Sequence, residues 1–436
     1  MNDKSKKINR RAFLGRGVAS AVALAGLSAF PASAPWASRK VTLRYWTFLD
    51  PKDPGPRSVA QTQIIEAFHK KYPEIEVKPE VMAWQQIEPQ LVQAVGAGKG
   101  PDVTRVAIQS VAVLSKAGTL LPLNPWIDKW TKAQKADFHG DWDASLIGGQ
   151  KMTLAIGVSA TIFCYRKDLL EKAGLKVPTT WDDLIVVAKA LTKDPVWGTA
   201  VGVSQKNQAS NLWQTFFPQV WSYGGDVLQG KKAVLDHPAW VETFRYWRDM
   251  VRVHKAAPPG IVNETTDTIM EAFRAGTVAT MFNQNQKLAQ VKTSKAIPPD
   301  SMGVTFMPGK GGKPGPNPMG GWQVGICKDV KEKEAAWLFI DHMLSPEMQF
   351  INAKVAEEVP SRKSVGADPW FKTAEAYYVN AYLKIAAESG RVFPYPAEFN
   401  NLADYLAVAI QQVIVNNAPI EKMLKETQDK YNTEVA

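Results

Sequence analysis

Strand and helix patterns alternate along most of the chain. Residues 41–46 (VTLRYW) place Val, Leu and Tyr against Thr, Arg and Trp with the period of two that is typical of a strand. Residues 63–73 (QIIEAFHKKYP) instead put their apolar side chains on one helical face and end at a proline, which cannot continue a helix. The same order of strand and helix returns over residues 75–118, where Gly118 occupies the C-cap place of the last helix. This repeated order favours an α/β domain with a mainly parallel sheet.

A second block of the same kind begins near residue 156. Residues 161–167 (TIFCYRK) are predicted to form a strand, and residues 168–174 (DLLEKAG) a helix closed by a glycine. Thr180 is predicted to cap the next helix, with Asp183 three positions later in a pattern close to a capping box. Later helices are expected over 238–254, 265–275 and most of 331–435, and strands over 154–158, 277–282 and both ends of 302–330.

The N-terminal residues have the pattern of an export signal. A basic start with Arg10 and Arg11 is followed by a Gly/Ala-rich apolar run that is shorter than the roughly 20 apolar residues of a membrane span. The order Arg-Arg-x-Phe-Leu resembles a twin-arginine signal, and an ordinary secretory signal is the alternative. Residues 1–34 are therefore predicted to be removed, although Pro35 is unfavourable directly after a cleavage site. The mature protein is expected to be periplasmic.

Charge and cysteine content exclude several classes of protein. The net charge is +10, but residues 1–34 carry six basic and one acidic side chain, so half of this charge lies in the expected signal. The remaining Lys and Arg are scattered, which favours a solvated surface over a nucleic-acid groove. Cys164 and Cys327 both lie in apolar runs and are interpreted as separate small hydrophobic residues, with a disulfide as the alternative. No Cys/His spacing indicates a metal, and no cofactor is predicted.

Eleven short segments follow one another in the order typical of a known family. The chain resembles the family 1 extracellular solute-binding proteins, the carbohydrate-binding receptors of ABC importers, and the resemblance covers nearly the whole expected mature chain. The segments are VTLRYW, AFHKKYPEIEV, VGAGKGPDV, LSKAGTLLPL, YRKDLLEKAGLKVPTTWDDL, WSYGGDVL, AFRAGTVATMF, GVTFMPG, GGWQVGI, AAWLFIDHMLSPEMQ and VPSRKSV.

This resemblance implies a two-lobe periplasmic binding protein fold, in which each lobe is a mainly parallel sheet flanked by helices and hinge crossovers join the lobes. Lobe 1 would comprise residues 40–155 plus 303–344, and lobe 2 residues 157–301 plus 346–436. A solute would be captured between the closing lobes and delivered to the permease subunits in the membrane. The resemblance implies a monomer that is not an enzyme.

Candidate ligand residues follow from the chemistry of sugars, whose flat C–H faces suit aromatic rings and whose hydroxyls suit amides and hydroxyls. The chain has 15 tryptophans, more than ordinary usage, and those within helices (Trp181, Trp240, Trp247 and Trp337) are interpreted as core residues. Tryptophans at strand ends and loop junctions are the better candidates. They are Trp46, Trp84, Trp221 and Trp322, with Trp213 a weaker one.

Other candidates depend on local pattern or on the resemblance. Gly320 and Gly321 before Trp322 let a ligand approach the backbone. The run MFNQNQ ends a strand with Asn283, Gln284, Asn285 and Gln286, and a solvated turn is the alternative interpretation. The resemblance further nominates Phe48, Asp50, Gln109, Ser110 and Ser159. Arg362, Arg44 or Arg105 could meet an anionic group, although Arg362 is interpreted first as a hinge or surface residue.

Two other functions remain open. A secreted glycoside hydrolase or lyase would need two carboxyl groups flanking the scissile bond, and Asp50 has no evident partner while Asp183 is expected to cap a helix. A receptor for a non-sugar solute, such as a glycerol phosphodiester, is the alternative within the same family. A polyamine is disfavoured because the candidate residues include few carboxylates.

Overall fold

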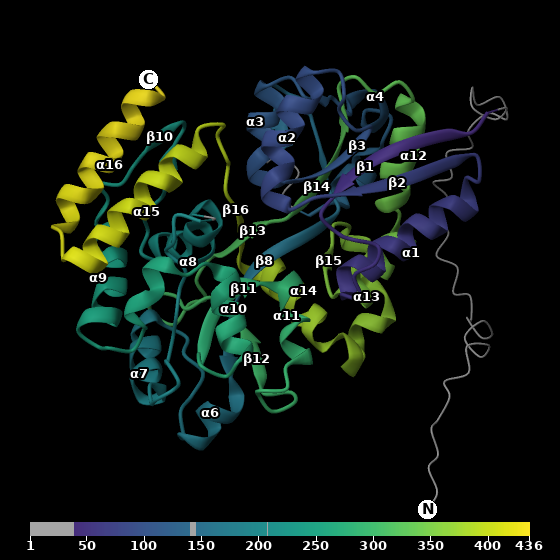
Figure 1. The fold of residues 1–436 in the computed structure, drawn as a ribbon. Coiled ribbons are helices and arrows are strands. Elements are labelled where there is room, and N and C mark those ends of the chain that lie inside the picture. The colour runs from purple at the N-terminus through teal and green to yellow at the C-terminus, as the bar shows by residue number, and fades with distance from the viewer. Residues whose placement is uncertain (1–38, 140–144, 207) are drawn as a thin grey trace, which may run out of the picture. The chain divides into compact units, whose positions relative to one another are not determined.

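The computed structural model describes residues 39–139, 145–206 and 208–436, coloured in Figure 1. The expected export signal therefore lies outside the described residues. From Val41 to Ala436 the chain forms one compact unit, which contains two six-stranded sheets. Among the described residues, no helix is long and apolar enough to cross a bilayer.

The first sheet contains the strands predicted at the start of the mature chain. The strand β1 (Val41–Thr47) pairs in parallel with β2 (Ile75–Val81) and β3 (Val103–Ala107). A much later strand, β14 (Trp322–Cys327), is antiparallel to β3 and also pairs with β4 (Leu120–Leu121) and β7 (Leu154–Ala155). This sheet mixes parallel and antiparallel pairs, because β14 enters from the opposite end.

The helices of this sheet include those predicted between its strands. The helix α1 packs against α12 and α13, and α2 lies beside α3 (Figure 1). Gly118 follows α3 with φ of +66°, the left-handed conformation expected at a C-terminal cap. The helices are α1 (Pro56–Lys71), α2 (Trp84–Gly96), α3 (Val111–Lys116), α4 (Asn124–Ile127), α5 (Lys132–Ala136), α12 (Lys333–Met343) and α13 (Pro346–Ala356).

The second sheet is organised around one long buried strand, β8 (Gly157–Arg166). Four strands pair with β8, and all four are antiparallel to it: β11 (Thr280–Gln284), β12 (Met302–Thr305), β13 (Asn317–Gly320) and β15 (Val359–Pro360). Only β16 (Gly390–Val392) forms a parallel pair, with β13. The prediction of a mainly parallel sheet therefore differs from the structure here, because the strands return to β8 in the opposite direction.

Helices surround the second sheet. Thr180 caps α7 as predicted, since its side chain accepts from the Asp183 amide at 3.0 Å and the Asp183 carboxylate accepts from the Thr180 amide. No element was predicted over α8, in which polar and apolar residues alternate irregularly although residues 211–221 are all buried. The helices are α6 (Lys167–Lys172), α7 (Trp181–Leu191), α8 (Gln208–Ser222), α9 (Pro238–Arg252), α10 (Thr266–Arg274), α11 (Asn285–Leu288), α14 (Tyr377–Ser389), α15 (Phe399–Asn416) and α16 (Ile420–Glu434).

Short elements complete the described chain. Two hairpins lie outside the main sheets, and single turns of 3-10 helix connect larger elements. They are β5 (Leu146–Ile147), β6 (Gln150–Lys151), β9 (Leu228–Gln229), β10 (Lys232–Ala233), η1 (Ile108–Ser110), η3 (Pro259–Asn263), η4 (Val291–Thr293), η5 (Lys363–Ala367), η6 (Pro369–Lys372) and η7 (Ala374–Ala376).

The sheet pairing differs from the expected division of the chain. Residues 303–344 were assigned to lobe 1, but β12 and β13 within this range pair with β8 of the second sheet. Of the strands in this segment, the one that joins the first sheet is β14, which follows the turn at Gly321. Helix α13, which was assigned to lobe 2, packs against α1 beside the first sheet. Pairing between remote strands decides these memberships, and a local pattern does not contain that information.

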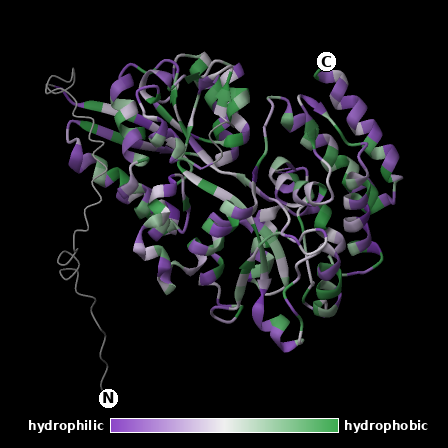
Figure 2. Ribbon diagram, turned by 180° about the vertical axis from the view of Figure 1, so that it is seen from behind, coloured by the Kyte–Doolittle hydropathy of each residue, from purple (hydrophilic) through white to green (hydrophobic). Residues whose placement is uncertain are grey.

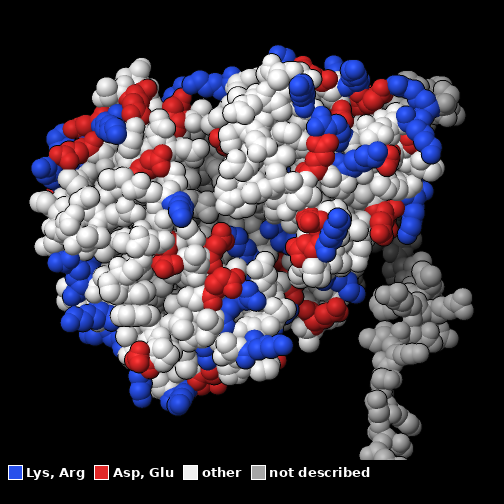
Figure 3. All heavy atoms as spheres, in the orientation of Figure 1, with Lys and Arg blue, Asp and Glu red and all other residues white. Residues whose placement is uncertain are grey.

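Burial follows the hydrophobic pattern. Many hydrophobic residues lie on the strands of both sheets, whereas hydrophilic ones are prominent on α16 (Figure 2). Cys164 and Cys327 are separate, buried free thiols, as predicted. The tryptophans predicted for the core are buried as well: Trp181, Trp240, Trp247 and Trp337. Figure 3 shows Lys and Arg interspersed with Asp and Glu on the face in view.

Candidate functional site

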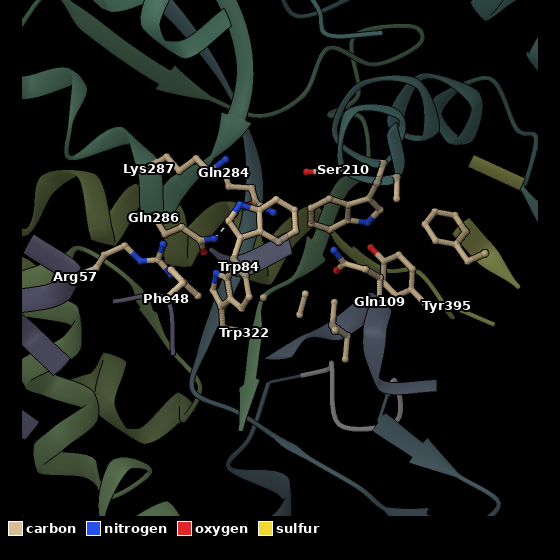
Figure 4. Close-up of a pocket in the computed structure, with 16 residues that line it drawn as sticks. Phe48, Arg57, Trp84, Gln109, Ser210, Gln284, Gln286, Lys287, Trp322 and Tyr395 are labelled. Carbon is tan, nitrogen blue, oxygen red and sulfur yellow. Dashed lines mark hydrogen bonds between the residues drawn. The ribbon is translucent and has the colours of Figure 1, made fainter. Parts of the chain in front are cut away.

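A cavity lies where elements of the two sheets meet. It encloses about 660 Å³, counting open solvent at its mouth, and Figure 4 shows its lining. Aromatic rings and amide side chains predominate. The lining residues are Phe48, Arg57, Trp84, Ala107, Ile108, Gln109, Ala209, Ser210, Trp213, Gln284, Gln286, Lys287, Gly321, Trp322, Tyr395 and Phe399.

An aromatic cluster forms the side that belongs to the first sheet. Trp322 begins β14, and its ring centroid lies 4.2 Å from that of Phe48, which follows β1. Trp84, the first residue of α2, meets Trp322 edge-on at 6.0 Å. The turn before Trp322 needs glycine, because Gly321 has φ of +137° and a Cβ there would lie 2.6 Å from the Gly157 carbonyl oxygen. These contacts hold the indole of Trp322 at the cavity wall.

Polar side chains from the second sheet face these rings. Gln284 ends β11 and Gln286 lies on α11, and the Gln286 amide donates to the Gln284 Oε1 at 2.9 Å. The Ser159 hydroxyl donates to the Gln286 Oε1, and this hydrogen bond fixes the orientation of the Gln286 amide. Lys287 also lines the cavity and forms an ion pair with Asp267. Amides that both donate and accept suit a ring of hydroxyl groups.

Three further aromatic residues line the cavity, and they come from the part of the chain around the second sheet. Trp213, on α8, has its ring centroid 6.4 Å from that of Tyr395, and Tyr395 packs edge-on against Phe399 at 5.1 Å. The indole Nε1 of Trp213 is buried and has no hydrogen-bond partner among the residues that the structure describes. The cavity therefore has aromatic surfaces from both sheets, with Gln284 and Gln286 at one end of the site and Gln109 near Tyr395 at the other (Figure 4).

A buried ion cluster lies behind the rings. The Arg57 Nε donates to the Glu358 Oε1 at 2.8 Å, and the Arg105 Nη2 lies 4.0 Å from the same oxygen. Burial acts to raise the pKa of Glu358, but the two guanidinium groups, with hydrogen bonds from Asn352 and Arg57, lower it on balance. Glu358 is therefore ionised at neutral pH.

A second cavity of about 800 Å³ adjoins the first and shares five lining residues with it: Trp84, Ala107, Gln109, Ala209 and Ser210. It adds Ser110 and Glu88 on the side of the first sheet and Gln208 and Asn400 on the other. Near these residues Lys116 of α3 forms an ion pair of 3.0 Å with Glu398, which directly precedes α15. The two cavities therefore adjoin at the five residues that they share.

The structure brings half of the sixteen predicted site residues into these two cavities. Seven line the first cavity, two of which (Trp84 and Gln109) also line the second, and one more lines the second alone. They are Phe48, Trp84, Gln109, Trp213, Gln284, Gly321 and Trp322 in the first, and Ser110 in the second.

Two other predicted residues contact the lining. Ser159 reaches the site through Gln286, and Gly320 lies behind Trp213, since a Cβ at Gly320 would be 3.1 Å from that ring. The remaining candidates have partners elsewhere. They are Trp46, which bonds to Glu80; the exposed Asp50, which accepts from the Lys52 amide; Trp221, bonded to Asp226; Asn283, bonded to Thr266; Asn285, bonded to the Ala160 amide; and Arg362, paired with Asp137.

Arg44 and Arg105, the other arginines considered for an anionic group, also have protein partners. Arg44 pairs with Glu80 at 2.6 Å, and Arg105 belongs to the buried cluster at Glu358. Arg362 donates a hydrogen bond to the Leu344 carbonyl, which joins two segments near α13, and only 12% of its side chain is exposed, so it is not a surface residue; its role as a hinge residue stays a prediction.

Several lining residues were not predicted, namely Arg57, Ser210, Lys287, Tyr395 and Phe399. Arg57 lies in the first turn of α1, where a basic residue gives no local signal of a site. Tyr395 belongs to the run VFPYPAEF, in which an aromatic residue between two prolines is a local signal of a loop that could line a site. In the described parts of the chain, no group of three His, Cys, Asp or Glu side chains could hold a metal ion.

Comparison with known proteins identifies the family. Residues 56–350 match the model of the bacterial extracellular solute-binding proteins. A binding protein of Brucella abortus is 22% identical over 379 residues, which cover 84% of this chain and 88% of the relative. The match to the family model spans more than half of the chain, which shows membership.

Solved structures have the same fold. Maltose-bound MalE3 of T. maritima superposes with a TM-score of 0.79 and 26% identity, covering 90% of this chain and 100% of that one. The ABC substrate-binding protein Lmo0181 of Listeria monocytogenes, in complex with cycloalternan, has a TM-score of 0.77 and 22% identity, over 91% of this chain and 99% of that one. The chain therefore has the two-lobe MalE-like fold and belongs to the bacterial extracellular solute-binding protein family, whose members are binding proteins and not enzymes.

Proposed function

We propose that this chain is the extracytoplasmic receptor of an ABC importer and that it captures a sugar or sugar derivative between two closing lobes. The observation that carries the proposal is the lining of the cavity, in which Trp84 and Trp322 come from one sheet and Trp213, Gln284 and Gln286 from the other. A solute there would touch both lobes, so its binding would favour the closed state.

The chemistry of the lining supports a sugar-like ligand. Indole rings offer flat apolar surfaces for C–H faces, and each glutamine amide can donate and accept hydrogen bonds with hydroxyl groups. The similarity to the maltose-bound T. maritima protein supports the same class of ligand. A glycerol phosphodiester is the second candidate, favoured by the cationic side chains of Arg57 and Lys287 in the lining.

Capture by closure is tested by small-angle X-ray scattering together with titration calorimetry. A panel of neutral and acidic mono- and oligosaccharides is screened first by the intrinsic tryptophan fluorescence of the purified protein. A ligand found in this way is expected to reduce the radius of gyration at saturation, because the lobes close around it. Saturation without any compaction would contradict capture by closure.

The fate of the ligand separates a receptor from an enzyme. After prolonged incubation the ligand is recovered and analysed by chromatography, with boiled protein as the control. We expect the ligand to be recovered unchanged, because no pair of carboxylates lines the first cavity among the described residues. Release of smaller products would overturn the assignment.

The proposal also covers the export of the protein, its partner in the membrane and the division of the chain into lobes. The pattern of residues 9–34 supports export by the twin-arginine route. The similarity to ABC transporter-binding proteins supports docking on permease subunits in the membrane, which we propose this chain does as a monomer. Replacing Arg10 and Arg11 by Lys tests the route, since export by the twin-arginine path should stop.

For the lobes, we propose that the first extends from β1 to β7 and returns at β14, as the sheet pairing indicates.

A further inference from the structure

Positive charge exceeds negative charge at one end of the cavity, around Arg57. Arg57 and Arg105 both face the same oxygen of Glu358, at 2.8 Å and 4.0 Å. The side chains are largely removed from solvent, with 14% of Arg57 and 4% of each of the other two exposed. Two guanidinium groups therefore share one carboxylate.

Among the described residues, the charged groups that act on Arg57 include no carboxylate besides Glu358. The other oxygen of Glu358 accepts from the neutral amide of Asn352 at 2.7 Å. Glu358 and Arg105 are the charged groups that act on Arg57 electrostatically, while the second cation of the lining, Lys287, is paired with Asp267. Among the described residues that line the first cavity there is no Asp or Glu, and Glu88 lines only the neighbouring cavity.

Two polar atoms of this cluster still have an unused hydrogen-bonding capacity, the Arg105 Nε and, in the residue that lines the cavity, the Arg57 Nη2. The Arg57 Nη2 is buried and has no hydrogen-bond partner among the described residues. Aromatic rings shield the guanidinium, since its carbon lies 5.1 Å from the ring centroid of Phe48 and 6.0 Å from that of Trp322. Burial lowers the pKa of Arg57, yet a guanidinium remains protonated at neutral pH.

Such a group gains most from an anionic partner. A buried donor without an acceptor is costly, and an oxyanion can accept two parallel bonds from the planar guanidinium. Figure 4 shows Arg57 on the same side of the site as Phe48 and Gln286, within the set of residues that line the cavity. The cluster is thus placed to meet a bound solute at this end.

We propose that the natural solute carries one singly charged oxyanion, which binds Arg57, while its sugar or polyol part lies against Trp84 and Trp322. This inference rests on the proposed receptor function and narrows its class of ligand. One excess positive charge matches a carboxylate or a phosphodiester better than a phosphate monoester, which approaches two negative charges at neutral pH. The carboxylate of a uronic acid and the phosphodiester of a glycerol derivative share this chemistry.

The test compares matched pairs of ligands by titration calorimetry on the full protein. The pairs are D-glucuronate with D-glucose, D-galacturonate with D-galactose, their disaccharide counterparts, and glycerophosphoglycerol with glycerol. We expect an acidic member to bind roughly 10- to 100-fold more tightly than its neutral counterpart, as for hydrogen bonds to a charged group. Binding of neutral members that equals or exceeds that of the acids would overturn the anionic subsite and leave the receptor function standing. If no pair binds, the proposed anionic subsite is overturned, whereas the receptor function is decided by the wider panel of the fluorescence screen.

Variants then test whether Arg57 causes the preference for the acidic ligand. Arg57→Gln should reduce the affinity for the acidic ligand roughly 10- to 100-fold and largely abolish the preference over the neutral one. Arg245→Gln, on the exposed face of α9, removes the same charge far from the lining and should change neither value. Arg57→Lys retains the charge without the fork and should restore part of the preference.

Thermal melting accompanies each variant, because Arg57→Gln also leaves Glu358 with fewer partners. If Arg57→Gln lowers the Tm but keeps the full preference for the acid, Arg57 serves only as the counter-charge of Glu358 and the proposal is overturned. If Arg57→Gln does not fold, the Arg57→Lys variant is used instead. An Arg57→Lys protein that keeps the full preference and the full affinity for the acidic ligand would also overturn the proposal.

Discussion

Phe48 and Trp322 lie with their ring centroids 4.2 Å apart, although one follows the first strand of the chain and the other begins β14. The same two rings cover the guanidinium groups of Arg57 and Arg105. One aromatic pair therefore packs against a buried ion cluster and supplies part of the wall of the cavity, which Arg57 of that cluster also lines.

The first prediction concerns Trp322. Trp322→Ala should weaken ligand binding by about 1–3 kcal/mol, the scale of losing a large apolar contact. Calorimetry with the ligand found in the fluorescence screen measures the loss. Trp370→Ala is the matched control, since Trp370 packs against Phe350 outside the cavity lining. An unchanged affinity in Trp322→Ala would remove this residue from the site.

The second prediction concerns the ion pair between Lys116 and Glu398. This pair joins α3 to the residue before α15, and 73% of the Lys116 side chain is exposed. Its contribution should therefore be small, about 0.2–1 kcal/mol, and Lys116→Met should reduce affinity only a few-fold by making the closed state less stable. Lys129→Met, another exposed lysine, is the control.

The same pair predicts a dependence on pH. The hydrogen bond from Lys116 lowers the pKa of Glu398, so the contribution is complete at neutral pH and is lost as the pH falls through that lowered value. Affinity measured from pH 7 downward in wild type and Lys116→Met should therefore converge in acid. A constant ratio over this range would exclude a role for the pair in closure.

The third prediction concerns the start of α7. Burial acts to raise the pKa of Asp183, but hydrogen bonds from Thr179 and Thr180 lower it on balance. Asp183→Ala should cost about 1 kcal/mol of unfolding free energy at neutral pH, and this difference should shrink as the pH falls through the lowered pKa. Urea titrations at several pH values measure it.

A neighbouring carboxylate provides the control for this prediction. Asp182 lies in the same first turn but does not form the capping box, so Asp182→Ala should cost less. Equal losses in the two variants would show that charge near the helix terminus, and not the reciprocal cap, provides the stability.

The fourth prediction concerns the cysteines. Cys164 and Cys327 are buried free thiols, and burial raises the pKa of each, so little thiolate is available to react. An aromatic disulfide reagent should therefore label neither cysteine in the native protein and both after denaturation without a reductant. Labelling of neither after denaturation would indicate a disulfide.

Local order was predictable from the sequence because it depends on near neighbours. The capping box of Thr180 and Asp183 and the left-handed Gly118 follow from side-chain chemistry and backbone freedom within a few residues. Trp181 and Trp240 were placed in the core by helical periodicity in the same way. The family, and with it the kind of fold, followed from the order of such segments along the chain.

Part of the site was predictable for the same reason. Gly321 and Trp322 form a strand entry whose sequence limits the backbone, and Gln284 ends a recognisable strand. Trp46 shows the limit of this reasoning. Because the last three residues of β1 are all buried, alternation along the strand could not tell which side chains face the cavity, and the Trp46 Nε1 instead donates to Glu80 at 2.8 Å.

Tertiary structure alone decided the contacts between remote segments. The approach of Arg57 to Glu358 and the pairing of β13 with β8 join residues that are far apart in the chain. Neither segment contains a local signal of its partner, because the energy of such a contact arises only when both side chains leave water together. The amino-acid sequence by itself thus determined the elements, their order and the class of protein, whereas packing between the two sheets decided which side chains form the cavity and where its charge lies.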